Sequence, residues 1–196
     1  MKDMITGNMV RLRDRRFADA VENYAWLTDP ELAKLDALPV PTLTFQQYMS
    51  DYTAELLYSS ATKQQFAIES LNGKQIGNCT YYGVDETKGD AELGIMIGNR
   101  DYWDKGYGTD AVTTLVNHIF RQTDIKRIHL KTLDWNIRAQ KCFQKCGFTP
   151  CGHLEKDGHN FVVMELYRDQ WEKAGRSGSK TRDERDKKAR KKKTNG

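Results

Sequence analysis

The chain contains an apolar segment, a turn with two glycines and an amphipathic helix in direct succession. Residues 91–98 are apolar and long enough for a buried strand, and residues 103–111 read W-D-K-G-Y-G-T-D-A. Between residues 111 and 120, apolar side chains recur every four positions, which gives a helix one apolar face. A helix that begins at such a turn directs backbone N–H groups and the positive end of its dipole toward one point. The stretch therefore predicts a phosphate-binding site at Gly106 and Gly108, which place no side chain between those amides and a ligand.

Three kinds of phosphate-binding turn are candidates for this stretch. A Walker-type loop requires Lys and then Ser or Thr after its last glycine, but Gly108 is followed by Thr and Asp. A dinucleotide fingerprint, G-x-G-x-x-G/A, matches residues 106–111 formally. That fingerprint belongs on an early strand and needs an acidic residue about twenty positions later, where this chain has Lys126. The third kind is a pyrophosphate loop with the pattern Q/R-x-x-G-x-G/A, which the turn matches from Gly106 on, with Trp103 in the Gln/Arg position.

A second motif follows about thirty residues after the turn. Residues 136–148 read N-I-R-A-Q-K-C-F-Q-K-C-G-F, which resembles the signature N-x-x-A-x-x-x-Y-x-K-x-G-F. Both patterns are signatures of the GNAT N-acetyltransferase superfamily, and the resemblance covers residues 9–171. A lone G-x-G would be a weak signal, whereas two signatures in the right order are a strong one. Residues 12–13, 28–31 and 101–109 resemble the branch that includes ribosomal-protein N-terminal acetyltransferases and many small-amine acetyltransferases.

The order of expected elements indicates an α+β or mixed α/β fold rather than a doubly wound sheet. Alternation and turn residues predict strands at 9–13, 65–69, 75–84, 91–98, 127–133, 148–154 and 161–167. Helical spacing and caps predict helices at 17–27, from 30 to before 39, and at 44–58, 112–121 and 138–146. The resemblance adds that the central, mostly antiparallel sheet is splayed beside the strand of Ile95, with helices on its flanks.

The resemblance implies acetyl-CoA as the co-substrate and no metal. Pantetheine is a string of amides, so an open strand edge can bind it by backbone hydrogen bonds, as it would bind a peptide. The positions that match this strand edge are Ile95, Met96 and Ile97. The positions whose amides would bind the pyrophosphate are Lys105, Gly106, Tyr107, Gly108 and Thr109. Asn136 matches the position that contacts the cofactor arm, and Asn also caps helices well, so both roles are open to it.

Glu92 is the candidate general base. Amines with pKa values of about 8–10 are mostly protonated at neutral pH, so a base helps the transfer. Glu92 stands fourteen residues before Gly106, the spacing of the catalytic Glu in histone acetyltransferases of this superfamily. The alternative is a structural carboxylate on the strand. Phe143 departs from the family pattern, because the family has a Tyr there that protonates the departing thiolate.

The activity that the resemblance implies is transfer of an acetyl group from acetyl-CoA to a primary amine. The branch favours a protein N-terminal α-amine as acceptor. A small amine, such as a polyamine, an amino acid or an antibiotic, is the alternative. Phe143 keeps open a third alternative, a non-catalytic acyl-CoA-binding regulatory module. Residues 38–41 lie where the family has its acceptor site and are either a specificity loop or a plain connector, and a homodimer stays open.

Charge divides the chain into an N-acetyltransferase domain, residues 1–171, and a basic tail, residues 172–196. The tail holds eleven Lys or Arg and four Asp or Glu, a net charge of +7, whereas the whole chain carries +4. Residues 174–193 contain no large apolar residue, so we expect the tail to be disordered. It is either an arm with weak, salt-sensitive affinity for nucleic acid or a solvated tail without a partner.

Composition places the protein in a reducing compartment. Four cysteines in 196 residues do not make a disulfide scaffold, no apolar run approaches the roughly 18 residues of a membrane span, and the first residues lack a signal-peptide pattern. We therefore expect a cytoplasmic protein without a membrane partner. Cys142 and Cys146 lie one helical turn apart and are expected to be small buried thiols rather than metal ligands.

Overall fold

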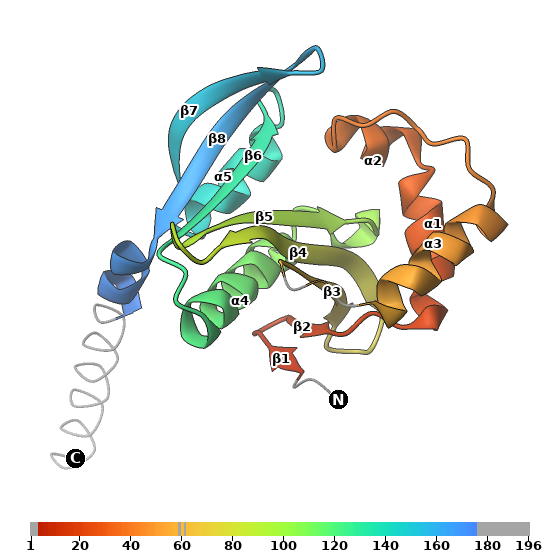
Figure 1. Ribbon diagram of the computed structural model, residues 1–196, viewed down its shortest axis with the longest axis horizontal. Helices are drawn as coiled ribbons and strands as arrows, with labels where there is room; N and C mark the ends of the chain where they lie inside the picture. The colour runs from red at the N-terminus through yellow and green to blue at the C-terminus, as the bar shows by residue number, and fades with distance from the viewer. Residues whose placement is uncertain (1–3, 59, 61, 176–196) are drawn as a thin grey trace, which may run out of the picture.

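A twisted eight-stranded sheet runs through the molecule, with helices packed on it (Figure 1). The computed structural model describes residues 4–58, 60 and 62–175. The strands are β1 (Ile5–Thr6), β2 (Val10–Arg13), β3 (Lys63–Ser70), β4 (Gln75–Asp85), β5 (Asp90–Ile97), β6 (Arg127–Leu133), β7 (Thr149–Lys156) and β8 (His159–Tyr167). The helices are α1 (Ala20–Leu27), α2 (Pro30–Leu35), α3 (Phe45–Leu57), α4 (Tyr107–Gln122) and α5 (Ile137–Lys145), with 3-10 turns η1 (Phe17–Asp19) and η2 (Arg100–Tyr102).

The strand order is β1-β2-β3-β4-β5-β6-β8-β7, and only β5 and β6 pair in parallel. The mixed α/β fold with a mostly antiparallel sheet is therefore confirmed. The parallel pairing is short, because its last pair is Glu92 with His129. On its other edge β5 stays paired with β4 as far as Ile97. Figure 1 shows β6, β8 and β7 diverging from β5, so the predicted splay is present.

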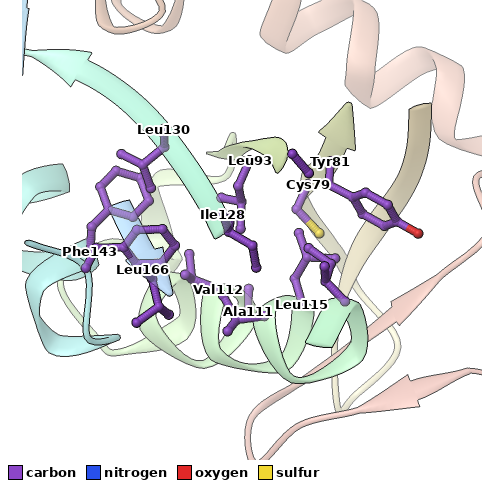
Figure 2. Close-up of a cluster of buried hydrophobic side chains, with 14 of the residues drawn as sticks. Cys79, Tyr81, Leu93, Ala111, Val112, Leu115, Ile128, Leu130, Phe143 and Leu166 are labelled. Carbon is purple, nitrogen blue, oxygen red and sulfur yellow. The ribbon is translucent and has the colours of Figure 1, made fainter. Parts of the chain in front are cut away.

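The main core lies between α4 and the sheet. The four-residue repeat of α4 places Ala111, Val112 and Leu115 on one face, and each of these residues has no exposed surface. Figure 2 shows these three side chains directed at Leu93 of β5 and Ile128 of β6. Because α4 begins immediately after the glycine turn, the burial of this face fixes the position of that turn.

A buried charge network joins the α1–α3 region to the sheet. The guanidinium of Arg13 on β2 donates to both carboxylate oxygens of Asp19 at 2.8 Å, and its Nε donates to Glu69 Oε2 at 2.7 Å. All three residues are buried. Asp19 ends η1, which leads into α1, whereas Glu69 lies on β3. The network therefore sets where the helices stand beside the strands.

The polypeptide after β8 is held against the far end of α4. Residues 168–175 are helical. The guanidinium of Arg168 donates to the carbonyl oxygens of Phe120, Thr123 and Ile125. Trp171 donates from Nε1 to Asn117 Oδ1 at 2.7 Å. The helix thus includes residues 172–175, which the sequence placed in the disordered tail, because Arg168 and Trp171 fix the segment that leads into them. Residues 176–196 lie outside the described residues.

β1 is a short edge strand that the sequence pattern did not predict. It pairs with β2, with Ile5 opposite Leu12. None of the helices in residues 4–58 and 62–175 combines the length and the apolar character that a membrane crossing requires.

Replacing Arg13 with Ala should lower the free energy of unfolding by about 3–5 kcal/mol, because it leaves two buried carboxylates without their partner. Arg11 is the matched control because it lies on the same face of β2. Its side chain is more exposed, and its Nη1 stands farther from Glu69 Oε1, at 4.0 Å. Arg11→Ala should cost no more than about 1 kcal/mol. Denaturant unfolding of both variants measures the difference, and equal losses would contradict the role assigned to the network.

Candidate active site

A cleft of about 490 Å³ opens where β5 and β6 diverge. One wall is the end of β5, and a second is the turn that leads into α4. α5 and the residue before it form the third wall. The fourth is α2 with Asp36, the residue that follows it. The cleft therefore exists because the parallel pairing stops early, and it is bordered by the same segments that carry the two sequence motifs.

The turn at the start of α4 has the geometry of an anion site. Gly106 is the N-cap of α4 with φ +90°, in the left-handed region that favours glycine, and no side chain caps the helix. Amides of the first helical turn have no partner within a helix. Gly108 and Thr109 of that turn line the cleft. The helix dipole and these amides together favour a phosphate group at this point.

Trp103 connects the turn to the edge of β5. Its indole Nε1 donates to the carbonyl oxygen of Ile97 at 2.6 Å. The guanidinium of Arg138, from the first turn of α5, lies 3.6 Å from the centre of the indole ring. Trp103 thus joins β5, the turn and α5 at the part of the cleft where the phosphate site is predicted. The sequence placed Trp103 at the Gln/Arg position of the loop pattern and predicted it as a wall of the cleft, and it does line the cleft.

α5 presents three cations to the cleft, which the sequence analysis did not identify. Arg138, Lys141 and Lys145 all line it. Their spacing of three and then four residues places them on one face of a helix, so the signal was present in the sequence. Positive side chains beside the amides of the turn suit a ligand with several phosphates.

Seven of the ten predicted site residues line the cleft: Ile95, Met96, Ile97, Gly106, Gly108, Thr109 and Asn136. Asn136 also caps α5, because its side chain accepts from the amide of Ala139 at 3.2 Å. Lys105 and Tyr107 are not among the lining residues. The side chain of Lys105 donates to the carbonyl oxygen of Asp101, and Tyr107 packs edge-on against Tyr102. The cofactor contacts of all these residues stay predictions.

Glu92 lies at the point where the strands separate but is not among the residues that line the cleft. Its Oε1 accepts from Lys131 Nζ at 2.7 Å, and its Oε2 is 3.9 Å from His129 Nε2. Burial raises the pKa of Glu92, but the hydrogen bonds from Lys131 and Tyr82 outweigh it, so the net pKa is lowered. Glu92 is therefore a charged carboxylate with a defined cationic partner. Its role as a base stays a prediction.

Phe143 is buried in the core, 7% exposed, with its ring centre 6.0 Å from that of Phe148. Figure 2 shows it beside Leu130 and Leu166. Phe143 is also among the residues that line the cleft. Its neighbour Cys142, about 100° further round the helix, faces Gly108 and Thr109. Cys142 and Cys146 are both partly exposed, which corrects the expectation of buried thiols.

α2 and the residue after it form a further wall of the cleft. Leu32, Leu35 and Asp36 line it, and the ammonium of Lys34 lies 5.6 Å from the ring centre of Trp135, which precedes α5. Surrounding protein raises the pKa of the Asp36 carboxyl, although solvent still reaches the residue and limits that effect. Residues 38–41 follow directly but do not line the cleft. Their part in acceptor choice stays a prediction.

The family model described as acetyltransferase (GNAT) domain matches residues 10–149. The chain belongs to the GNAT acetyltransferase family. It is an acyltransferase that uses acetyl-CoA as the acyl donor. Within the described residues, no group of three or more His, Cys, Asp or Glu side chains could hold a metal ion.

Three similar proteins illustrate this GNAT enzyme's relatives. An uncharacterized N-acetyltransferase p20 of Bacillus licheniformis is 26% identical over 144 residues, 73% of this chain and 80% of the relative. An aminoglycoside N(6')-acetyltransferase type 1 of Serratia marcescens is 25% identical over 185 residues, 87% of this chain and 89% of the relative. The structure of spermidine N-acetyltransferase from Vibrio cholerae in complex with CoA and spermine superposes with a TM-score of 0.74 and 17% identity. It covers 83% of this chain and 97% of that one.

Replacing Gly108 with Ala should weaken CoA binding about tenfold without lowering the melting temperature. An added Cβ would lie 3.6 Å from Cys142 Sγ and 3.8 Å from Ile97 Cγ1, an ordinary contact, so the fold accepts it. Ala is also the better helix former. The methyl group would nevertheless occupy the cleft wall beside the amides. Titration calorimetry with CoA and thermal unfolding measure the two effects.

Gly106→Ala is the matched control for that variant. Because Gly106 has φ +90°, this substitution should destabilise the fold by about 1–2 kcal/mol. Gly106→Ala thus tests what the backbone conformation requires, and Gly108→Ala tests what the ligand requires. Wild-type CoA affinity in Gly108→Ala would contradict the assignment of the phosphate site.

Proposed function

We propose that this GNAT enzyme acetylates a small amine that carries more than one positive charge. The observation that carries the proposal is Asp36, a carboxylate on the α2 wall of the cleft. Leu32 and Leu35 beside it would contact methylene groups, and the carboxylate would hold a second ammonium group of the same molecule. The names of two similar proteins, for aminoglycosides and for spermidine, support a small polycationic acceptor.

A protein N-terminal α-amine is the second candidate. It is favoured by the resemblance of residues 101–109 to the branch of ribosomal-protein N-terminal acetyltransferases. The exposed apolar side chains of Leu38 and Val40, next to the α2 wall, would suit a peptide acceptor. The two candidates differ in what the acceptor needs, a second cation or a peptide backbone.

The chemistry requires a neutral amine that attacks the thioester carbonyl and a thiolate that leaves. The cations and amides at the phosphate end hold the donor, so the acetyl end projects toward α2. Phe143 supplies no proton, but a thiol with a pKa of about 8.5 leaves as a thiolate without help from an acid. Glu92 is proposed to accept the amine proton through solvent, with Lys131 keeping its carboxylate charged.

The test of the acceptor is release of free thiol from acetyl-CoA with a panel of amines. Spermidine, an aminoglycoside, a simple monoamine and a peptide with a free N-terminus form the panel. We expect turnover with spermidine or the aminoglycoside and little with the monoamine. Turnover with the peptide alone would establish the second candidate, and cofactor binding without thiol release for every amine would contradict both.

Asp36→Asn should raise KM for the polycationic acceptor about fivefold, since an exposed charge pair contributes roughly 1 kcal/mol. The KM for acetyl-CoA should not change, because the donor binds at the other end. Asp51→Asn, on the exposed surface of α3, is the matched control. Steady-state kinetics with spermidine and acetyl-CoA measure both KM values. An unchanged acceptor KM in Asp36→Asn would show that this residue is not part of the acceptor site.

Glu92→Gln should lower kcat about 100-fold, the range of general-base catalysis, with an unchanged KM for acetyl-CoA. Because the pKa of Glu92 is lowered from 4.5, its carboxylate is the basic form at every pH above that value. An acid limb of the rate profile near neutral pH would therefore belong to another group. The exposed Glu86→Gln serves as control. A kcat that Glu92→Gln leaves intact would show that the carboxylate is structural.

A further inference from the structure

Two thiols that the proposed chemistry does not use meet at the phosphate end of the cleft. Cys142 Sγ lies 3.5 Å from Thr109 Oγ1, and Cys146 Sγ lies 3.5 Å from the carbonyl oxygen of the same Thr109. Thr113 donates to Cys146 Sγ at 3.6 Å. Cys142 also lines the cleft. The pair thus connects α5 to the first turns of α4, where the phosphate site lies.

The surroundings of Cys142 favour its thiolate form. A hydrogen bond from Cys146 lowers the pKa of Cys142, burial opposes it, and Thr109 and the nearby charge of Lys145 add to the lowering. The sulfur also faces the start of α4, whose dipole favours a negative charge. The thiolate is the reactive form of cysteine, so Cys142 is the thiol of the pair that reacts first.

The thiols of Cys79 and Cys151 have raised pKa values, in contrast to that of Cys142. Cys79 is 2% exposed, and burial raises the pKa of its thiol well above the usual value. Cys151 is exposed, but its thiol is bonded to the carbonyl oxygen of Val163, and burial of the sulfur together with the nearby Glu165 raises its pKa. Low pKa, partial exposure and a second thiol within reach are the features of redox-sensitive cysteines, and only Cys142 among the four has all three.

The two side chains lie on one face of α5, but a bond between their sulfurs requires a local adjustment of the backbone. Four residues along a helix separate Cα atoms by roughly 6 Å, within the range of disulfides, whereas Cβ atoms at this spacing are about 5–6 Å apart, more than the roughly 3.5–4.5 Å of a disulfide. Cys146 is the C-cap of α5, and its amide bonds to the carbonyl oxygen of Phe143 rather than to that of Cys142. Gly147, with φ +96°, follows directly. The end of the helix is therefore the place where the local adjustment for a disulfide costs least.

We propose that Cys142 is an oxidative modification site inside the acetyl-CoA cleft, with Cys146 as its resolving thiol. The oxidant is a peroxide. The Cys142 thiolate attacks one oxygen of hydrogen peroxide, the O–O bond breaks, and the products are Cys142 sulfenic acid and hydroxide. The Cys146 thiol then attacks the sulfenic sulfur, forming the S–S bond and releasing water. Both thiols are oxidised by one electron each, and the peroxide is reduced by two.

The disulfide would break the contacts that hold α5 beside the turn before α4. The bond would draw Cys142 Sγ away from Thr109 Oγ1 and Cys146 Sγ away from the Thr109 carbonyl and Thr113. These contacts hold α5, with Arg138, Lys141 and Lys145, against the turn that binds phosphate. Oxidation should therefore weaken CoA binding about tenfold, and reduction with dithiothreitol should restore it. Neither effect depends on which amine is the acceptor.

The experiment treats the purified full chain with hydrogen peroxide and then measures CoA affinity by calorimetry and the state of each cysteine by peptide mass spectrometry. The wild-type protein should lose two hydrogens in the peptide that contains both cysteines and bind CoA more weakly. In Cys146→Ser the sulfenic acid should persist and be trapped by dimedone at Cys142. Cys151→Ser, away from the cleft, should respond to peroxide as the wild type does.

Two results would overturn the proposal. One is peroxide treatment that leaves Cys142 unmodified while other cysteines react. The other is a Cys142→Ser variant whose CoA affinity falls on peroxide treatment as far as that of the wild type. Because the untreated protein's CoA affinity is measured in the same series, a failed cofactor site would be seen separately as an absence of binding before any oxidation.

Discussion

The early end of the pairing between β5 and β6 is the constraint on which the site depends. Every other pair of neighbouring strands is antiparallel, and this one is parallel and stops at Glu92 and His129. A parallel connection needs a crossover, which α4 provides, and the turn before α4 therefore lies beside the point where the strands separate. The open edge of β5 and the positive end of α4 consequently face the same cleft. One feature of the sheet thus places the two segments predicted to bind the cofactor at one cleft.

Charged side chains line the cleft on three walls. α5 contributes the cations Arg138, Lys141 and Lys145, the residue after α2 is the carboxylate Asp36, and the turn before α4 contributes a second carboxylate, Asp104. Trp103 lies between β5 and α5, bonded to Ile97 and stacked on Arg138. Charges of both signs in one cleft suit two ligands of opposite charge, which is the basis of the proposed pairing of an anionic donor with a cationic acceptor.

Local pattern was sufficient for most of the elements and for most of the residues that line the cleft. The glycine turn, the apolar face of α4 and the cap Asn136 depend on neighbours within a few residues, which the sequence displays directly. The missed features join distant positions. Lys131 lies thirty-nine residues from Glu92, and Glu69 fifty-six from Arg13. The direction of Cys142 into the cleft depends on Phe143 entering the core. Sequence spacing specifies which residues share a face but not which face meets which partner.

The attachment of residues 168–175 fixes where the described chain ends relative to the cleft. Arg168 and Trp171 fasten this segment to the last turns of α4, whereas the cofactor turn is at its first. A helix of 16 residues separates the two ends by about 24 Å. Residue 175, where the described chain stops, therefore lies by the last turns of α4, at the other end of that helix from the turn that borders the cleft.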